Sequence, residues 1–359
     1  MKVLQVINSL GTGGAEKLIA DYVPLMNQKG VAVDVLILSD LEGPFLERVK
    51  KNNVKVINLN ARSFYSPLNI FKMAKYIGEY DVVHSHLFPA NYFTALAKIV
   101  KPFSNKKVKL VTTEHNNTNR RFERKYLQFI DRFIYNRYAA LIAITPSIKQ
   151  VLWERIGHPD ISIVYNAVNI QELYNAQPVP FPENQVNLLM VASFSDRKDH
   201  GTIIKAIAQL DNKYHLYLAG KGPMERTWRE LCRNLNIENR VHFLGSRKDV
   251  PGLMKAADLN ILSSNWEGLS CAALEAMASG TPFLGTDING IKELFVDNDF
   301  ALFSNGDVEG LVEKINRITK DESFSKLQAE TNFTAVQQYD IEIMTEHYLE
   351  IYKRVMQKN

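Results

Sequence analysis

The sequence has few cysteines and no long apolar run. Only Cys232 and Cys271 occur among its 359 residues, too few for a disulfide framework and without metal-site spacing. This usage is typical of a reducing compartment, so we expect a cytoplasmic protein. No apolar run approaches about 18 residues, so no segment is expected to span a membrane. Residues 1–8 lack a small-residue cleavage site and predict a first β-strand, not a signal peptide.

Charge of one sign is not in large excess over the whole chain, whose formal net charge is +4. The two halves differ, however. Residues 1–180 contain 23 Lys and Arg against 14 Asp and Glu, a net of +9, and residues 181–359 contain 20 against 25, a net of −5. This split indicates that the first half meets an anionic partner. No nucleic-acid-binding module is recognisable, so nucleic acid is not an expected partner.

The order of apolar segments predicts two α/β domains. The length exceeds what one hydrophobic core usually organises, and strand-like segments alternate with helical ones, as in parallel sheets. The expected strands are 3–8, 32–38, 54–59, 82–85, 109–113, 141–144 and 163–165 in the first half, and 187–192, 215–219, 241–244, 259–263 and 282–285 in the second. The three prolines of Gln177–Asn184 predict a linker. Doubly wound domains bind ligands at strand carboxyl ends, so we expect the active site in a cleft between the domains.

Two glutamates, Glu267 and Glu275, stand in an unusual setting. Residues 271–279 predict a short helix of small and apolar residues, with Ser270 as its N-cap. Glu275 is the only charge on this helix, so its carboxylate needs donors from elsewhere in the fold or from a ligand's hydroxyls. Glu267 precedes the helix start, where free N–H groups can hold an anion. This setting suits a sugar joined to a diphosphate. The alternative is that Glu267 is an ordinary loop residue and that Glu275 pairs with a distant cation.

The run Glu267-Gly268-Leu269-Ser270, followed by Glu275-Ala-Met-Ala-Ser-Gly-Thr-Pro282, resembles the motif of the retaining glycosyltransferases with the GT-B fold, the large family four. The resemblance implies two Rossmann-like, doubly wound parallel-sheet domains with a cleft between them. We expect an acceptor domain at 1–180, completed by a C-terminal helix at 340–359, and a sugar-donor domain at 181–339. By the same resemblance, Glu275 would hold ribose hydroxyls and Glu267 a sugar hydroxyl.

A glycine cluster, Gly11–Lys17, follows the first expected strand and opens a helix. Glycines there allow backbone to approach a phosphate closely. Glu16 excludes two known phosphate-binding motifs. A dinucleotide fingerprint has Gly or Ala at this position, and a P-loop has Gly directly before its lysine, which here would be Lys17. The cluster is similar to the family's first loop, which implies that Gly13 and Gly14 face the donor phosphate and the acceptor. A plain tight turn is the alternative.

Three histidines lie near predicted strand ends, at His84, His86 and His115. We expect His84 and His86 to point to opposite faces of their strand, which would prevent a shared zinc ion. The resemblance implies that His115 touches the transferred sugar and that the other two are structural. No metal site and no cofactor are expected.

The second half contains further motifs that match the family. Lys198 matches a lysine that neutralises the leaving diphosphate, but Ser193 stands where the family has an arginine, which leaves Arg197 of the same loop as a substitute. Gly220 and Gly222 match a turn beside the nucleotide. Arg247 lies in a run that resembles the loop around the base, although a solvated basic turn is an equal alternative.

A basic, aromatic segment spans residues 119–138. Its C-terminal half predicts an ordinary amphipathic helix that packs on its own domain with its cations in water. Its N-terminal half has four cations within six residues, Arg120, Arg121, Arg124 and Lys125. This density favours a surface for anionic lipid headgroups.

The sequence therefore predicts a retaining, metal-independent glycosyltransferase of the hexosyltransferase type, peripheral on the inner face of the cell membrane. Its expected partners are a nucleotide-sugar donor, most plausibly a UDP-sugar, and a saccharide or lipid-linked saccharide acceptor in the synthesis of a cell-surface polysaccharide such as lipopolysaccharide or capsule. Lys198 and the backbone at Gly268–Ser270 would replace a metal ion at the diphosphate. An Asp-x-Asp pair at Asp297 and Asp299, a metal motif of another glycosyltransferase fold, is interpreted as surface.

Two alternatives remain open at this stage. The first is a sugar-nucleotide epimerase or a phosphorylase, which share the GT-B architecture. The second is a non-catalytic protein that binds a sugar nucleotide or a lipid, made conceivable by the absence of the family arginine at Ser193.

Overall fold

The computed structural model describes residues 1–11, 13–39, 43–101, 108–115, 124–295 and 299–357. They form two compact units, one of Met1–Asn166 with Ile341–Asn359 and the other of Ala167–Asp340. Each unit is a parallel sheet covered by helices, so the predicted doubly wound α/β class is confirmed.

The first unit contains a seven-stranded sheet in the order β3-β2-β1-β4-β5-β6-β7, in which every neighbouring pair is parallel. Its strands are β1 (Lys2–Ile7), β2 (Ala32–Ile37), β3 (Val56–Asn58), β4 (Val82–His86), β5 (Lys109–Glu114), β6 (Ala140–Ala143) and β7 (Ile161–Ile163). All residues of β4 and β6 are buried, because helices cover both faces of the sheet.

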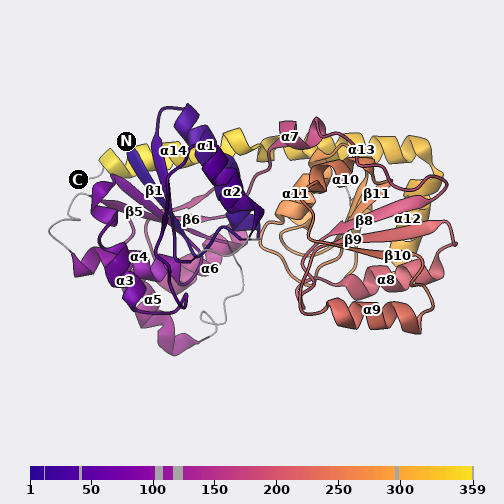
Figure 1. Cartoon of the computed structure of the whole chain (residues 1–359), viewed down its shortest axis with the longest axis horizontal. Coiled ribbons are helices and arrows are strands. Elements are labelled where there is room, and N and C mark those ends of the chain that lie inside the picture. Colours follow the sequence, from indigo (N-terminus) through magenta and orange to yellow (C-terminus); the bar gives the residue numbers. More distant parts are fainter. Residues whose placement is uncertain (12, 40–42, 102–107, 116–123, 296–298, 358–359) are drawn as a thin grey trace. The chain divides into compact units, whose positions relative to one another are not determined.

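The helices of this unit are α1 (Gly14–Gln28), α2 (Pro44–Lys51), α3 (Leu68–Met73), α4 (Ala90–Val100), α5 (Gln128–Tyr135), α6 (Pro146–Ile156) and α14 (Ile341–Gln357). Short 3₁₀ turns occupy Ile77–Glu79 and Lys125–Leu127. Figure 1 shows α1, α2 and α14 on one side of the strands and α3, α4 and α5 on the other.

The last helix, α14, belongs to the first unit although it follows the whole of the second in sequence. Its tyrosines Tyr348 and Tyr352 are fully buried. The ring of Tyr348 meets that of Tyr22 on α1 edge to face, with 5.3 Å between centroids, and the Tyr352 hydroxyl accepts a hydrogen bond from Gln5 on β1. The core of the first unit therefore contains side chains from both ends of the sequence.

The second unit contains a six-stranded parallel sheet in the order β10-β9-β8-β11-β12-β13. Its strands are β8 (Val186–Val191), β9 (Tyr214–Ala219), β10 (Val241–Gly245), β11 (Leu259–Leu262), β12 (Phe283–Thr286) and β13 (Leu302–Phe303). Its helices are α7 (Ile170–Tyr174), α8 (His200–Gln209), α9 (Glu225–Asn234), α10 (Val250–Ala256), α11 (Cys271–Ala278), α12 (Val308–Lys320) and α13 (Glu322–Val336), with 3₁₀ turns at Lys292–Leu294, Asp299–Ala301 and Gln337–Tyr339.

The division between the units lies at residues 166 and 167, before the boundary that the prolines predicted at residue 180. The reason is that α7 and the proline segment pack on the second unit. Helix α7 contacts α10 and α11, and the N–H group of Val179 donates to the carbonyl of Gly252. The proline segment is thus part of the second unit's surface.

The order of strands reverses once in each sheet, and ligands of doubly wound folds bind outside the strand ends at such a point. In the second unit the reversal lies between β8 and β11. The loop after β8 carries Lys198 and the loop after β11 carries Glu267. In the first unit the reversal lies between β1 and β4, next to the glycine cluster and His86.

Candidate functional site

The central feature of the second unit is a buried ion pair between Lys198 and Glu267. Lys198 is 6% exposed and Glu267 is 7% exposed. The same carboxylate oxygen of Glu267 accepts a hydrogen bond of 3.0 Å from the Ser264 hydroxyl, and a backbone bridge joins Lys198 to Ser264. The loops that follow β8 and β11 are thereby tied together at the reversal point of the sheet.

Burial and neighbouring charges act in opposite directions on Lys198. Burial lowers the pKa of its ammonium group, and the Glu267 carboxylate raises that pKa in part. The charge of Arg197 lowers it further, which places a second cation of the same loop within electrostatic range. Ser193, at the position of the family arginine, is exposed.

Glu275 is buried on α11, as the sequence predicts, with 7% of its surface exposed. Ser270 occupies the N-cap position of α11, but its side chain makes no capping hydrogen bond, so the cap expected from its hydroxyl is wrong. The Ser270 N–H group donates to the carbonyl of Gly290, and Leu269 is buried. The predicted anion seat at the N-terminus of α11 therefore does not include the Ser270 N–H group.

Two of the expected nucleotide-side glycines, Gly220 and Gly222, are required by backbone packing. A Cβ atom on Gly220, whose φ is +159°, would lie 1.9 Å from the carbonyl oxygen of Ala192. A Cβ atom on Gly222 would lie 2.3 Å from the carbonyl oxygen of Phe194. Only glycine allows the turn after β9 to approach the loop after β8 this closely.

Arg247 lies at the end of β10 in an exposed turn, where two of its nitrogens donate to the Asp249 carboxylate at 2.8 and 2.5 Å. This pairing raises the pKa of Arg247 and lowers that of Asp249. In this arrangement Arg247 matches the solvated turn that the sequence left open as an alternative.

In the first unit, Gly13 is the N-cap residue of α1 and Gly14 is its first residue. The carboxylate of Glu16 folds over Gly13, so that a Cβ atom there would meet it at 2.4 Å. Burial raises the pKa of Glu16. The start of α1, which was expected to face a phosphate, is therefore occupied by the carboxylate of Glu16. From the sequence, Glu16 indicated only that this is not a dinucleotide site.

His84, His86 and His115 form one buried cluster at β4 and the end of β5. The rings of His84 and His86 are 4.1 Å apart between centroids, and His86 Nδ1 lies 3.2 Å from His115 Nε2. The expectation that His84 and His86 point to opposite faces is wrong, because residues two apart on a strand share a face. Burial lowers the pKa of each ring, that of His115 to about 4.

The histidine cluster is bonded to side chains that the sequence analysis did not single out. His84 Nδ1 lies 2.6 Å from the Tyr352 hydroxyl, and His84 Nε2 lies 2.7 Å from the Thr113 hydroxyl. His86 Nε2 lies 3.0 Å from Gln5 Oε1. A Gln on β1 and a Tyr near residue 350 give no sequence signal of this kind, because only the fold brings them together.

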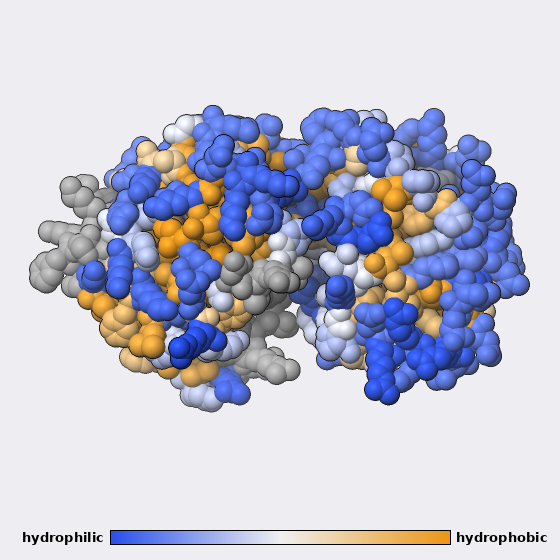
Figure 2. All heavy atoms as spheres, in the orientation of Figure 1, coloured by the Kyte–Doolittle hydropathy of each residue, from blue (hydrophilic) through white to orange (hydrophobic). Residues whose placement is uncertain are grey.

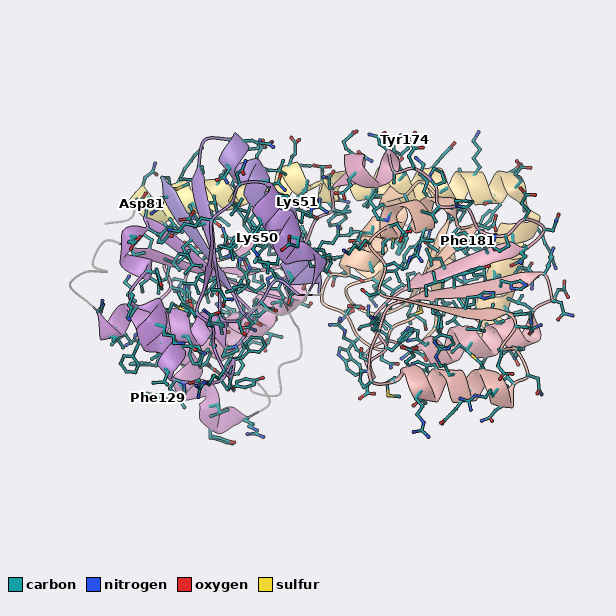
Figure 3. The ribbon with its side chains drawn as sticks, in the orientation of Figure 1. Lys50, Lys51, Asp81, Phe129, Tyr174 and Phe181 are labelled. Carbon is teal, nitrogen blue, oxygen red and sulfur yellow. The ribbon has the colours of Figure 1, made fainter. Side chains whose placement is uncertain are left out.

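Helix α5 packs on its own unit, as predicted for this half of the segment, but it does so through Asp131, Ile134 and Tyr135, and its aromatic side is exposed. Phe129 is 79% exposed, Ile130 and Phe133 are also exposed, and Tyr126 on the preceding 3₁₀ turn is 72% exposed. Figure 2 shows apolar side chains at the surface in the region where Figure 3 labels Phe129.

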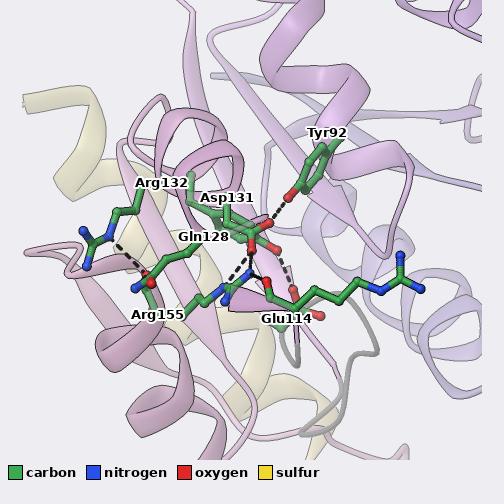
Figure 4. A network of polar contacts seen from close by, with 8 residues as sticks. Tyr92, Glu114, Gln128, Asp131, Arg132 and Arg155 are labelled. Atoms are coloured by element: carbon green, nitrogen blue, oxygen red, sulfur yellow. Dashed lines mark hydrogen bonds and ion pairs between the residues drawn. The ribbon is translucent and has the colours of Figure 1, made fainter. Parts of the chain in front are cut away.

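A buried polar network holds α5 in this orientation (Figure 4). The carboxylate of Asp131 is fully buried and lies 2.7 Å from Arg155 of α6, and it accepts a hydrogen bond from Tyr92. Tyr135, one turn later, donates to Glu114 of β5 at 2.7 Å. Because Asp131 and Tyr135 face inward, the aromatic residues on the opposite side of the helix face outward.

Of the four expected headgroup-binding cations, Arg120 and Arg121 lie outside the described residues, as does Asp297. Arg124 is exposed, and its carbonyl accepts a hydrogen bond from Arg155. The backbone of Lys125 begins the 3₁₀ turn before α5, and that of Asp299 begins another such turn. Among the residues with described placement, no helix meets the length and apolarity that crossing a bilayer requires, and no cluster of three His, Cys, Asp or Glu is arranged to hold a metal ion.

Comparisons with known proteins match both units. A family model described as "Glycosyltransferase Family 4" matches residues 12–172, and one described as "Glycosyl transferases group 1" matches residues 174–334. Together they cover most of the chain, the first including Gly13, Gly14 and His115 and the second including Lys198, Glu267 and Glu275.

Individual relatives are more distant. The N-acetyl-alpha-D-glucosaminyl L-malate synthase of Bacillus anthracis is 27% identical over 288 residues, 77% of this chain and 75% of that protein. The N-acetylgalactosamine-N,N'-diacetylbacillosaminyl-diphospho-undecaprenol 4-alpha-N-acetylgalactosaminyltransferase of Campylobacter jejuni is 24% identical over 93% of this chain and 94% of that protein. Among solved structures, Anabaena HepE in complex with UDP and glucose superposes with a TM-score of 0.84 over 99% of this chain and 100% of that chain, at 22% identity.

Proposed function

Because the chain belongs to the group 1 glycosyltransferases with the GT-B fold, we propose that it transfers a sugar from a nucleotide-sugar donor to a saccharide acceptor with retention of configuration and without a metal ion. The observation that carries this proposal is the buried pair of Lys198 and Glu267 at the reversal point of the second sheet. In this proposal the donor's diphosphate contacts Lys198 at this place, and the Glu267 carboxylate faces the sugar.

In the proposed mechanism, Lys198 stabilises the charge that develops on the departing diphosphate. Arg197 supplies the second positive charge that the family arginine would give, since it already acts on Lys198 electrostatically. The N-terminus of α11, where Ser270 makes no side-chain cap, adds the partial positive charge of a helix end. These groups replace a metal ion.

The carboxylates position the sugar donor. Glu275 holds ribose hydroxyls and Glu267 a hydroxyl of the transferred sugar, both by charge-assisted hydrogen bonds. The acceptor hydroxyl attacks the anomeric carbon from the side of the leaving group. As the new C–O bond forms, the bond from carbon to phosphate oxygen breaks, and the acceptor's proton passes to the departing phosphate.

A UDP-sugar is the proposed donor. The support is that HepE, which shares the fold over the full length, binds UDP together with glucose, and binds UDP-glucose in another structure. A lipid-linked saccharide is the proposed acceptor, because the Campylobacter relative is named for a diphospho-undecaprenol acceptor. A Rhizobium meliloti relative that is 31% identical over 172 residues is named for lipopolysaccharide core synthesis.

Docking on the cytoplasmic face of an anionic membrane completes the proposal. The support is the exposed aromatic face of α5, with the exposed cations Arg124 and Arg132 and the net charge of +9 on residues 1–180. Aromatic side chains enter the headgroup boundary while cations remain with anionic lipids. A lipid-linked acceptor would then reach the enzyme by diffusion in the membrane plane.

The test is a panel of sugar nucleotides scored first by thermal shift and then by turnover. A ligand at 100 times its dissociation constant stabilises the fold by about 2.7 kcal/mol, so the donor stands out from the panel. Release of nucleoside diphosphate only after an acceptor is added supports a transferase. Turnover of the donor without an acceptor indicates an epimerase. Release of a product that requires inorganic phosphate indicates a phosphorylase, and binding without any turnover indicates a non-catalytic protein.

A further inference from the structure

Gln5, in the middle of β1, sets the direction of a chain of hydrogen bonds that ends at His115. Its Nε2 donates to the Tyr352 hydroxyl at 3.0 Å. Its Oε1 accepts from the Tyr22 hydroxyl at 2.9 Å and lies 3.0 Å from His86 Nε2. Gln5, Tyr22 and Tyr352 are each fully buried, so water does not compete for these bonds.

The chemistry of an amide fixes which histidine nitrogens carry protons. Gln5 Oε1 can only accept a hydrogen bond. The Tyr22 hydroxyl also lies 3.2 Å from His86 Nε2, but its one proton is donated to Gln5 Oε1, so His86 Nε2 is the donor toward both oxygens. In a neutral ring the other nitrogen, His86 Nδ1, is then an acceptor. It lies 3.2 Å from His115 Nε2, which must therefore carry the proton of its own ring.

The second branch of the network agrees with this direction. Because the Tyr352 oxygen accepts from Gln5, its proton is free to be donated to His84 Nδ1, 2.6 Å away. His84 Nε2 then carries the proton and donates to the Thr113 hydroxyl at 2.7 Å. Each printed contact of the three histidines then joins one donor to one acceptor with neutral rings, and burial disfavours a charge on any of the three by lowering the pKa of each.

We propose that Gln5 and His86 are positioning residues that hold His115 as a neutral ring with its proton on Nε2, so that Nδ1 is available only as a hydrogen-bond acceptor. The inference rests on the proposed function in one respect, the placement of His115 against the transferred sugar. A ring fixed in this state accepts a hydrogen bond from a sugar hydroxyl. It cannot form a hydrogen bond with a carboxylate, because neither Nδ1 nor the carboxylate carries a proton at neutral pH.

The donor sugar is therefore selected for a hydroxyl at this place. With His115 placed at carbon 6 of the sugar, a hexose presents a hydroxyl to it and a hexuronic acid presents a carboxylate, and a site whose polar group is left unpaired rejects such an analogue strongly. The chain thus prefers a UDP-hexose to the matching UDP-hexuronate. Tyr352 of α14 contributes to this selection, because its hydroxyl accepts from Gln5 Nε2 and so orients the Gln5 amide.

The direct test is the tautomer of His115, read by nitrogen-15 NMR of the histidine rings of the whole protein near neutral pH, without substrate. Assignment uses a His115→Gln variant. The expected result is an Nε2–H tautomer, with Nδ1 in the range of an unprotonated acceptor. A His115 ring protonated on Nδ1, or on both nitrogens, overturns the proposal even if the protein proves to be a glycosyltransferase.

Gln5→Met removes the amide that sets the direction, and Ser85→Ala is its matched control. Ser85 is also fully buried, lies between the two histidines on β4 and bonds to Tyr138 instead. The Gln5→Met variant should shift the His115 signals toward a mixture of tautomers, whereas Ser85→Ala should leave them unchanged. Unchanged tautomers in a folded Gln5→Met protein contradict the role of Gln5.

Binding completes the test, with UDP-glucose and UDP-glucuronate as probes. The wild type should bind UDP-glucose at least 10-fold more tightly, an estimate of order 1.4 kcal/mol, and Gln5→Met should reduce that preference. Equal binding of both by the wild type overturns the selection by His115. If neither binds while the Nε2–H tautomer is found, the hydrogen-bond chain stands and the proposed function fails instead.

Discussion

Lys198 and Glu267 are 69 positions apart in the sequence and form a buried ion pair within the second unit. The pair links two loops that each follow a strand at the reversal point of the sheet. Each residue is proposed to contact a different part of the sugar donor. The pair therefore holds both side chains near their working positions before the donor arrives, which reduces the ordering that binding must achieve.

Breaking this pair should destabilise the second unit. Lys198→Met leaves the carboxylate of Glu267 buried without its cation, a loss of about 3–5 kcal/mol in the free energy of unfolding for pairs of this kind. Denaturant unfolding monitored by Trp fluorescence measures it. The double variant Lys198→Met with Glu267→Gln should recover most of the stability, because no uncompensated charge remains. A double variant as unstable as the single one would show that packing, and not charge, determines the loss.

Glu275→Gln should keep the fold and weaken nucleotide binding. An amide accepts weaker hydrogen bonds from ribose hydroxyls than a carboxylate does, and the expected loss is roughly 1.5–3 kcal/mol. Calorimetric titration of wild type and variant with UDP measures the change in dissociation constant. An unchanged affinity together with a lower melting temperature would assign Glu275 to the structure of α11 alone.

Turnover should persist in excess EDTA, because cations and helix N–H groups are proposed to stabilise the leaving group. The measurement is the initial rate with the donor that the panel identifies, before and after dialysis against chelator. Loss of activity that manganese or magnesium restores would contradict this prediction and would draw attention to Asp297 and Asp299.

Replacing Arg120, Arg121, Arg124 and Lys125 with Gln or Ser should release the protein from anionic vesicles at low salt. Each cation near the surface contributes on the order of 1 kcal/mol, and screening by salt removes this contribution. Co-sedimentation with vesicles of anionic and of neutral lipids is the measurement. UDP binding should be unaffected, because the cations belong to the first unit.

The control for charge replaces four exposed cations of the second unit, Lys205, Lys213, Arg226 and Arg233, and should leave sedimentation unchanged. Phe129→Ser with Phe133→Ser separates insertion of the α5 aromatic face from charge alone. This double variant should weaken vesicle binding even at high salt. Equal sedimentation of wild type and both first-unit variants would leave the acceptor free to be a soluble sugar.

Stability of the first unit should fall as the pH decreases from about 6.5 toward 4. The pKa of His115 is lowered to about 4 by burial, against about 6.5 in an unfolded chain. Between these values the unfolded state binds the proton and the folded state does not, so the stabilisation is complete above 6.5 and is lost on acidification. One such group contributes about 2 kcal/mol between about pH 7 and pH 5. Unfolding curves of wild type and His115→Gln at several pH values measure it, and parallel curves would contradict the assignment.

The strands could be predicted because strands buried on both faces are almost continuous apolar runs. Each of the twelve predicted strands overlaps a strand of the structure, although the one predicted at 163–165 shares only Ile163 with β7. Strand β13, with two residues, is too short to give a pattern. Lys198, Glu267 and Glu275 could be selected by their motifs. The ion pair of the first two could not, since it depends on how the loops after β8 and β11 meet.

Helix α5 shows why periodicity alone was insufficient there. Its aromatic residues recur at helical spacing, which is the usual pattern of a buried face. A single charged residue reverses the assignment, because Asp131 finds Arg155 on the following helix. A buried carboxylate is tolerated only with such a partner, and a sequence does not show which arginine will be within reach.

The return of α14 to the first unit has a consequence for biosynthesis. Tyr348 and Tyr352 fill the core beside α1 and β4, yet they are translated only after the entire second unit. At about 5–20 residues per second, a ribosome that has completed Asn166 needs roughly 10–40 seconds to reach them. During that interval the side of α1 that packs on α14 in the finished protein, including Tyr22, lacks this contact, and Gln5 lacks the Tyr352 hydroxyl as its partner. We therefore expect the first unit to reach its final packing only after α14 has been made, and a ribosome stalled within the second unit would leave the first unit without this helix.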